Sequence, residues 1–167
     1  MVNARAELLE LARGAAADVP DPEIPGLSIA DLGILRSVDE SDGCVVVTIT
    51  PTYSGCPAMH KIERDIDEAL HSVGITKFRI ERELIPAWTT ESITESGRRK
   101  LHDSGIAPPN PLTHNYQVVV DITLPSVTCP ICGSTKSTVT SEFGSTPCKA
   151  FYHCEDCLST FEYFKPI

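Results

Sequence analysis

Two pairs of cysteines near the C-terminus constrain the fold of this chain more than any other feature. Cys129 and Cys132 form one CxxC motif and Cys154 and Cys157 form a second, with twenty-one residues between the motifs. This spacing is typical of a zinc ribbon, in which each CxxC places two sulfurs on a tight turn. Because four thiolates leave no coordination position open, the pattern predicts a structural zinc site rather than a catalytic one.

The pattern leaves one other metal and two other ligands open. Rubredoxin-type iron uses the same four sulfurs, so the sequence alone does not decide between zinc and iron. His153 and Cys148 are rival ligands because they lie close to the second motif. A strand that rises about 3.3 Å per residue would carry Cys148 more than about 15 Å from the metal. We therefore expect Cys148 to be a thiol at the tip of a hairpin.

Composition and charge narrow the class of protein. The chain of 167 residues has seven cysteines and no N-terminal pattern of a secretory or transit signal, which favours metal-bound or reactive thiols in a reducing compartment. We expect a cytoplasmic protein. The net charge of −9 argues against a nucleic-acid partner. No window approaches the roughly 20 apolar residues that span a bilayer, so we expect no membrane association.

The hydrophobic pattern predicts an α+β protein, with a small mixed α/β domain followed by a β-rich zinc ribbon. In the first domain the order helix, strand, strand, helix, strand, helix falls at residues 3–13, 34–40, 44–50, 57–74, 77–85 and 90–101. Further strands are expected at residues 116–124, 137–143, 149–153 and 160–164. A Pro-rich linker at residues 105–115 would separate a domain at 1–104 from the ribbon domain at 116–167.

Cys56 is the candidate functional thiol of the first domain. Pro57 suits the first position of a helix, which predicts that Cys56 is the N-cap, where free amides stabilise a thiolate. His60 follows one turn later and is placed to share that side of the helix. The alternative is a cysteine that packs as a small hydrophobic residue. The sequence gives the two interpretations equal weight.

Three stretches resemble the SufT-type domain of iron–sulfur assembly factors. They are Asp-Pro-Glu-Ile-Pro at 21–25, Asp-Leu-Gly-Ile at 31–34 and Thr-Ile-Thr-Pro-Thr-Tyr-Ser-Gly-Cys-Pro at 48–57. Further matches are Ala-Trp-Thr-Thr at 87–90, Gly-Arg-Arg-Lys-Leu at 97–101, Gly-Ile-Ala-Pro-Pro at 105–109 and Cys-Pro-Ile-Cys-Gly-Ser at 129–134. With these, essentially the whole chain is similar to the PaaD family, the accessory subunits of phenylacetyl-CoA epoxidase.

The resemblance implies an accessory role in aerobic phenylacetate degradation. There, a multicomponent oxygenase with a di-iron subunit and an iron–sulfur flavin reductase epoxidises the ring of phenylacetyl-CoA. The resemblance also implies that Cys56 carries the assembly function and that Asp21, Glu23 and Asp31 lie in signature loops. For these acids, bracing of the loops by side-chain hydrogen bonds is the alternative. The same alternative holds for Trp88.

Three functions remain to be compared. The first is a non-catalytic maturation factor, in which Cys56 binds or relays transient iron or an iron–sulfur species and the ribbon docks an oxygenase component. Its partners would be oxygenase components or iron–sulfur assembly proteins. The second is a structural or regulatory subunit of the oxygenase. The third is an enzyme with Cys56 as nucleophile, His60 as base and Asp21 as the orienting acid. The sequence leaves a homo-oligomer open.

Overall fold

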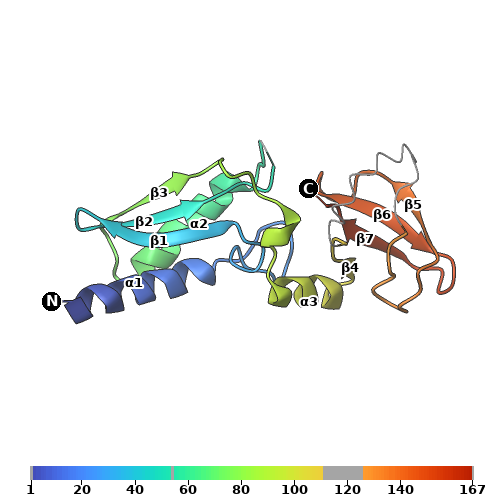
Figure 1. Cartoon of the computed structure of the whole chain (residues 1–167), viewed down its shortest axis with the longest axis horizontal. Helices are drawn as coiled ribbons and strands as arrows, with labels where there is room; N and C mark the ends of the chain where they lie inside the picture. Colours follow the sequence, from blue (N-terminus) through green and yellow to red (C-terminus); the bar gives the residue numbers. More distant parts are fainter. Residues whose placement is uncertain (1, 54, 111–125, 167) are drawn as a thin grey trace. The chain divides into compact units, whose positions relative to one another are not determined.

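The computed structural model describes residues 2–53, 55–110 and 126–166 and has the mixed α/β architecture that the sequence predicts (Figure 1). Two compact units divide the chain, residues 1–97 and 98–167, and the division falls within the helix α3, Glu95–Asp103. The strand predicted at 116–124 lies outside the described residues. The domain bounds expected from the sequence, 1–104, 105–115 and 116–167, stay a prediction.

The first unit is built on a three-stranded sheet in the order β1-β2-β3. The strands β1, Leu35–Ser41, and β2, Cys44–Ile49, form an antiparallel hairpin that turns through Asp42 and Gly43, both at positive φ. The strand β3, Phe78–Arg82, pairs with β2 in parallel, so the chain crosses over between them through the helix α2, Met59–Ser72.

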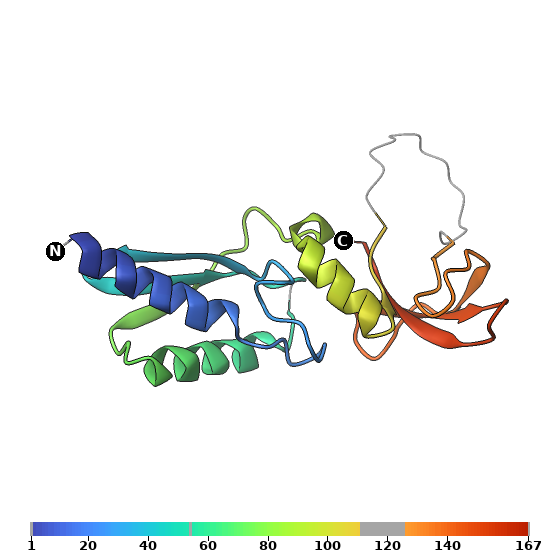
Figure 2. The same ribbon diagram turned by 90° about the horizontal axis from the view of Figure 1, so that it is seen from below.

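Two helices contribute the rest of this core. Figure 2 shows α1, Val2–Ala17, running beside α2 next to the sheet. The apolar stripe expected on α2 is buried along most of its length. Its buried members are Met59, Ile62, Ile66 and Leu70, which pack in the same unit as Val38, Val45, Val47 and Ile49 of the sheet. The apolar residues spaced three and four apart in α2 therefore form the side of the helix that faces the core.

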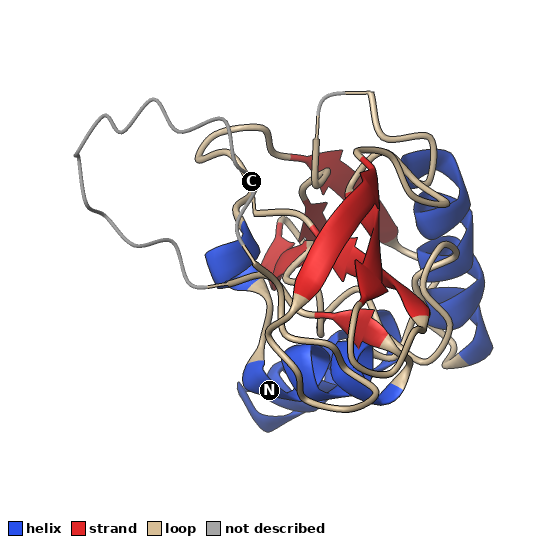
Figure 3. Ribbon diagram, turned by 90° about the vertical axis from the view of Figure 1, so that its right-hand side faces the viewer, coloured by secondary structure: helices blue, strands red, loops and turns tan. Residues whose placement is uncertain are grey.

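The second unit contains a four-stranded sheet in the order β4-β7-β6-β5. The described residues after α3 form strands and loops and no helix, and Figure 3 draws the strands in red and the loops in tan. The strands are β4, Ile106–Ala107, β5, Ser137–Ser141, β6, Lys149–Cys154, and β7, Thr160–Phe164. The strands β5, β6 and β7 are antiparallel neighbours, whereas β4 pairs with β7 in parallel. Residues 106 and 107, inside the expected linker, are therefore part of this sheet.

Three helix boundaries differ from the sequence-based prediction. The helix α1 continues past Gly14 through three alanines, which are strong helix formers. The helix α2 begins at Met59 rather than at Pro57. The helix expected at 90–101 is a short 3₁₀ turn at Thr90–Ser92 followed by α3, because Thr94 Oγ1 accepts the Gly97 amide at 2.9 Å and so caps the start of α3.

None of the described helices is both long enough and apolar enough to cross a lipid bilayer.

Two glycines allow the loop at residues 28–34 to lie directly against the segment at 92–97. A Cβ on Gly97 would stand 2.4 Å from the carbonyl oxygen of Asp31, and a Cβ on Gly33 would stand 2.3 Å from that of Ser92. The Thr94 amide also donates to Asp31 O at 2.9 Å. Backbone contact at this distance requires that no side chain intervene.

We predict that Gly97→Ala destabilises the protein by about 1–3 kcal/mol, because the new methyl group must push the Asp31 backbone away. Gly14→Ala is the matched control, since no atom lies within 4 Å of its added Cβ and the position is helical. We expect this control to stabilise by roughly 0.5–1 kcal/mol. Denaturant unfolding of both variants measures the difference, and equal effects would contradict the close approach.

Candidate metal centre and candidate thiol site

The two CxxC motifs form turns, or knuckles, with matching backbone hydrogen bonds. In the first, the Cys129 amide donates to Ser134 O at 2.8 Å. In the second, the Cys154 amide donates to Ser159 O at 2.9 Å. Each knuckle closes with a residue at positive φ, Gly133 at 75° and Leu158 at 60°. The second knuckle therefore holds a leucine, whose side chain is 72% exposed, in a conformation that favours glycine.

The four cysteines converge as the sequence predicts. Their Sγ atoms all lie within 4.8 Å of one another, with 3.8 Å between Cys129 and Cys157 and 3.5 Å between Cys132 and Cys154. Tetrahedral zinc with Zn–S bonds of about 2.3 Å needs sulfurs about 3.8 Å apart. The donor set and its spacing therefore fit one zinc ion, which would be held by two sulfurs from each knuckle and would supply a cross-link between them.

Hydrogen bonds within the knuckles shift the pKa values of Cys157 and Cys132 in opposite directions. The hydroxyl and amide of Ser159 lower the pKa of the Cys157 thiol to about 6. The Ser134 amide acts in the same direction on Cys132, but hydrogen bonds to Cys157 and the other thiols raise the pKa of Cys132 to about 12. Four thiols in one cluster therefore compete for protons, and a divalent cation relieves this competition.

The rival ligands lie elsewhere. Among the described residues the metal-binding group consists of the four cysteines, without His153 or Cys148. Cys148 is buried beside the turn before β6, with Sγ 3.0 Å from Thr146 Oγ1. His153 sits on β6, where it pairs with Thr138 on one side and Thr160 on the other.

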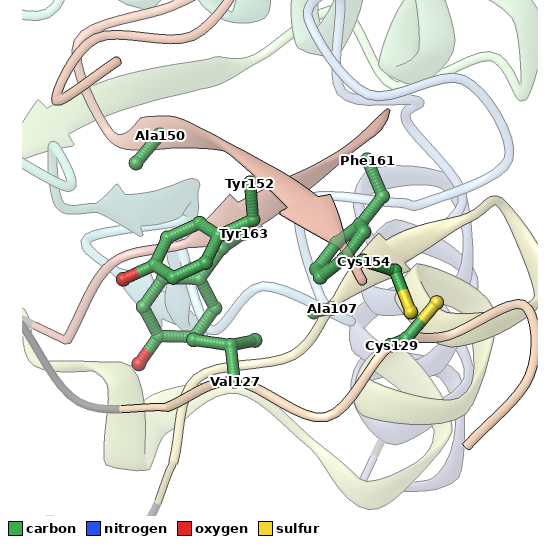
Figure 4. Close-up of a cluster of buried hydrophobic side chains, with 8 residues drawn as sticks. All are labelled: Ala107, Val127, Cys129, Ala150, Tyr152, Cys154, Phe161 and Tyr163. Carbon is green, nitrogen blue, oxygen red and sulfur yellow. The ribbon is translucent and has the colours of Figure 1, made fainter. Parts of the chain in front are cut away.

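A small aromatic cluster supports the metal site. Figure 4 shows Cys129 and Cys154 beside Phe161, with Tyr152 and Tyr163 farther along the same sheet. Tyr152 stacks on Phe161 with ring centroids 6.0 Å apart and meets Tyr163 edge-on at 5.4 Å. Among the described residues this cluster includes two cysteines of the metal group, Cys129 and Cys154. A metal ion held by the four sulfurs would therefore be bonded directly to side chains of the ribbon's buried core.

In the first unit, the acidic loop at residues 18–27 is folded by the carboxylate of Asp21. Its Oδ1 accepts the amides of Glu23 and Ile24 at 2.9 and 2.8 Å, and its own amide donates to Leu27 O at 2.8 Å. Asp21 is only 8% exposed. Its side chain therefore braces the loop through these hydrogen bonds.

Asp31 and Trp88 also have bracing contacts. Asp31 Oδ2 accepts the amide and hydroxyl of Ser28 at 3.0 and 3.2 Å. The Trp88 indole is buried and donates through Nε1 to Leu32 O at 2.8 Å. Both side chains therefore position the 28–34 loop.

Cys56 lies in a turn before α2, half-buried, with two acids of the 18–27 loop close enough to act on it electrostatically. Burial is the largest cause that raises the pKa of its thiol, and the carboxylates of Glu23 and Asp21 raise it further. Hydrogen bonds from the Ala58 amide and with the Thr52 side chain oppose this shift without reversing it. The structure thus brings three of the residues selected from the sequence together, Cys56, Glu23 and Asp21.

The expectation that Cys56 is an N-cap thiolate was wrong. Ala58 is the N-cap of α2, so Cys56 lies two residues before it and receives one amide rather than the open end of the helix. Partial burial and two nearby negative charges then favour the protonated thiol. A low-pKa nucleophile is therefore not what this geometry produces.

His60 is directed to other partners. Its side chain is 85% exposed, and in the described part of the chain its Nδ1 lies 3.9 Å from Glu63 Oε2 and 3.4 Å from an Arg82 nitrogen. Arg82 forms a two-nitrogen ion pair with Glu63, which holds the pKa of that carboxyl low. The structure therefore does not bring His60 to Cys56.

Sequence reasoning missed two threonines. Thr52 is buried and shares a hydrogen bond with the Cys56 thiol. Thr50, at the end of β2, is 1% exposed, and its Oγ1 has no hydrogen-bond partner within the described residues. Both lie in the stretch at 48–57 that resembled assembly factors, so that motif was the signal. Buried hydroxyls are normally paired, which marks this loop as specialised.

Comparison with known proteins gives two family matches. Residues 12–77 match the iron-sulfur cluster assembly protein family, and residues 115–165 match the PaaD zinc beta ribbon domain. A crystal structure of a domain of unknown function, DUF59, from Bacillus anthracis superposes with a TM-score of 0.54 at 22% identity. The superposition covers 60% of this chain and 97% of the Bacillus anthracis chain. At this identity it shows only that the fold is shared.

Two relatives extend these matches. An Escherichia coli K12 protein, provisionally named as the D subunit of 1,2-phenylacetyl-CoA epoxidase, is 44% identical over 90% of this chain and 88% of its own length. A Porphyromonas gingivalis Fe-S protein maturation auxiliary factor is 36% identical over 50% of this chain and 80% of its own. Fold and sites define an iron–sulfur assembly domain joined to a zinc ribbon. The chain belongs to the PaaD family of 1,2-phenylacetyl-CoA epoxidase subunits.

We predict close to one zinc per chain by elemental analysis. Cys132→Ser should lose this zinc and the ordered tyrosine environment of the second unit, although Cys132 is the exposed member of the cluster. Cys148→Ser, at a buried cysteine, should keep the zinc. Near-ultraviolet circular dichroism follows the tyrosines. Loss of zinc in Cys148→Ser with retention in Cys132→Ser would show that the ligand set is wrong.

We also predict that Cys56 alkylates at higher pH than an unperturbed cysteine. Alkylation requires the thiolate, and the raised pKa keeps this thiol protonated to higher pH. Glu23→Gln removes one charge that raises the pKa, so its labelling profile should move toward lower pH. Mass spectrometry of the Cys56 peptide over a pH series gives both profiles.

Asp39→Asn is the matched control for this experiment, because it removes an exposed charge from β1 that is not among those acting on Cys56. Its profile should coincide with that of the wild type. A Glu23→Gln profile that moves toward higher pH would contradict the assigned electrostatics.

Proposed function

We propose that this protein is an accessory maturation factor for the phenylacetyl-CoA epoxidase complex, which assembles or delivers iron or iron–sulfur centres to oxygenase components. The observation that carries the proposal is the thiol of Cys56 beside the acidic loop, in a region that matches iron-sulfur cluster assembly proteins. The relatives' names support both halves of the proposal, maturation and the epoxidase. We expect it to act in the cytoplasm, where thiols stay reduced.

The electrostatics of Cys56 suit an exchangeable cation. The negative potential of Glu23 and Asp21 that favours a proton on Sγ also favours a positively charged iron species there. Binding would release the thiol proton, so iron uptake should strengthen as the pH rises. A single thiolate with neighbouring carboxylates holds iron less completely than four thiolates do, which suits a cargo that must be passed on.

The geometry gives less support to an enzyme that uses Cys56 as its nucleophile. Such an enzyme needs a thiol of lowered pKa with a base in hydrogen-bond reach. The pKa of Cys56 is raised, and His60 contacts Glu63 and Arg82 instead. The structural-subunit alternative rests on the name of the Escherichia coli relative, which describes a component of the epoxidase. Permanent stoichiometric copurification with the oxygenase would favour that alternative.

The test is co-expression of the oxygenase with Cys56→Ala in cells that lack the wild-type protein. We expect iron content and turnover of the oxygenase to collapse at matched soluble levels of the variant, because the cargo ligand is gone. Folding should change little, since removing a half-buried sulfur costs about 1–2 kcal/mol or less.

Cys44→Ala is the control, because Cys44 is a partly buried cysteine of the same unit, on β2. It should support normal iron loading. Normal iron and turnover with Cys56→Ala would disprove the relay, whereas an insoluble Cys56→Ala protein would assign Cys56 a packing role.

A further inference from the structure

A group of polar contacts joins the two knuckles outside the sulfur cluster. Ser134 follows the first CxxC, and its Oγ donates to Oδ2 of Asp156, which lies inside the second CxxC, at 2.6 Å. Lys136 Nζ lies 3.3 Å from the other carboxylate oxygen of Asp156. The Lys136 amide donates in turn to Ser134 Oγ at 3.0 Å. These three residues, here called the knuckle clamp, therefore form one connected network.

The position of this network matters for metal binding. Each close sulfur pair, Cys129 with Cys157 and Cys132 with Cys154, takes one sulfur from each knuckle. A tetrahedral site therefore requires the knuckles to keep a fixed separation. Beyond the clamp, Ser137 pairs with Cys154 at the start of the β5–β6 ladder. The clamp thus spans the knuckles at the point where the ladder gives way to the metal site.

We propose that Ser134, Lys136 and Asp156 are positioning residues, which hold the two knuckles at the sulfur spacing that zinc needs and so slow the loss of the metal. The Lys136 and Asp156 side chains are 69% and 48% exposed, so their ion pair by itself contributes little. The hydrogen bond from Ser134 carries most of the effect, because it is short and charge-assisted and because it fixes the carboxylate.

The sign of the effect separates this role from simple electrostatics. Zinc with four thiolates carries a formal charge of −2, and Asp156 adds another negative charge beside it. If only charge mattered, replacing Asp156 by a neutral residue would hold zinc more tightly. The clamp predicts the opposite, because the neutral residue loses the ion pair with Lys136 and weakens the hydrogen bond from Ser134. Ser134→Ala changes no charge, so it isolates the geometric contribution.

The experiment measures the rate at which zinc-loaded full-length protein transfers its zinc to an excess of a chromogenic chelator. Ser134→Ala and Asp156→Asn should each accelerate transfer by about 3- to 10-fold, below the usual range for contacts that bind a ligand residue directly. Ser134→Thr keeps the hydroxyl and should restore the wild-type rate. The double variant should be no faster than the faster single variant, since the residues act as one unit.

Glu155→Gln is the matched charge control. Glu155 lies beside Asp156 in the second CxxC. It contacts Lys136 through its backbone amide, which donates to Lys136 O at 2.9 Å. Its side-chain replacement should not accelerate transfer. All rates are compared at a temperature at which thermal melting shows every zinc-loaded variant folded. Should Ser134→Ala fail to fold, Asp156→Asn and Ser134→Thr carry the comparison.

A wild-type rate for Ser134→Ala, slower transfer for Asp156→Asn, or equal acceleration by Glu155→Gln would each overturn the proposal. Faster transfer for Ser134→Ala and Asp156→Asn, with wild-type rates for Ser134→Thr and no acceleration by Glu155→Gln, would establish it.

Discussion

The convergence of four cysteine sulfurs, at a spacing that fits one metal ion, is the feature on which the second unit of this protein is built. Among the described residues, Cys129 and Cys154 belong both to this metal group and to the buried cluster of the unit. Each knuckle is closed by its own hydrogen bonds, and the knuckle clamp links the two, so that the four sulfurs converge between preformed turns. A divalent cation bound there would cross-link the turns further, and its binding free energy would become folding free energy.

The environment of Cys56, the candidate thiol of the first unit, differs from that of the ribbon cysteines. The four cysteines of the ribbon share a closed cluster, whereas Cys56 is half-buried in a loop with two carboxylates near it. The acids are themselves fixed by the local turn that Asp21 makes with the Glu23 and Ile24 amides. This contrast between the closed four-cysteine group and the half-buried thiol beside two carboxylates supports the proposal of a permanent metal in the ribbon and an exchangeable iron species at Cys56.

The features of the sequence that predicted the structure best are the hydrophobic periodicity of α2 and the two CxxC motifs. The stripe of Ile62, Ile66 and Leu70 is buried, and each CxxC motif forms a knuckle, because helix periodicity and short turns are local properties. The start of α2 at Met59 was missed because Pro57 fits a turn as well as a helix. The raised pKa of Cys56 was missed for another reason. That pKa is raised mainly by burial of the thiol and further by the carboxylates of Glu23 and Asp21, more than thirty positions earlier in the sequence, and both causes arise only from the fold.

The most direct test of these two roles is iron K-edge X-ray absorption of the zinc-loaded protein after addition of one equivalent of Fe²⁺ under anaerobic conditions. We predict iron with one sulfur neighbour and oxygen neighbours, and the sulfur signal should vanish in Cys56→Ala. Iron with four sulfur neighbours would lie in the ribbon, and iron with no sulfur neighbour would leave Cys56 without a metal role. Either result would contradict the proposed role of Cys56.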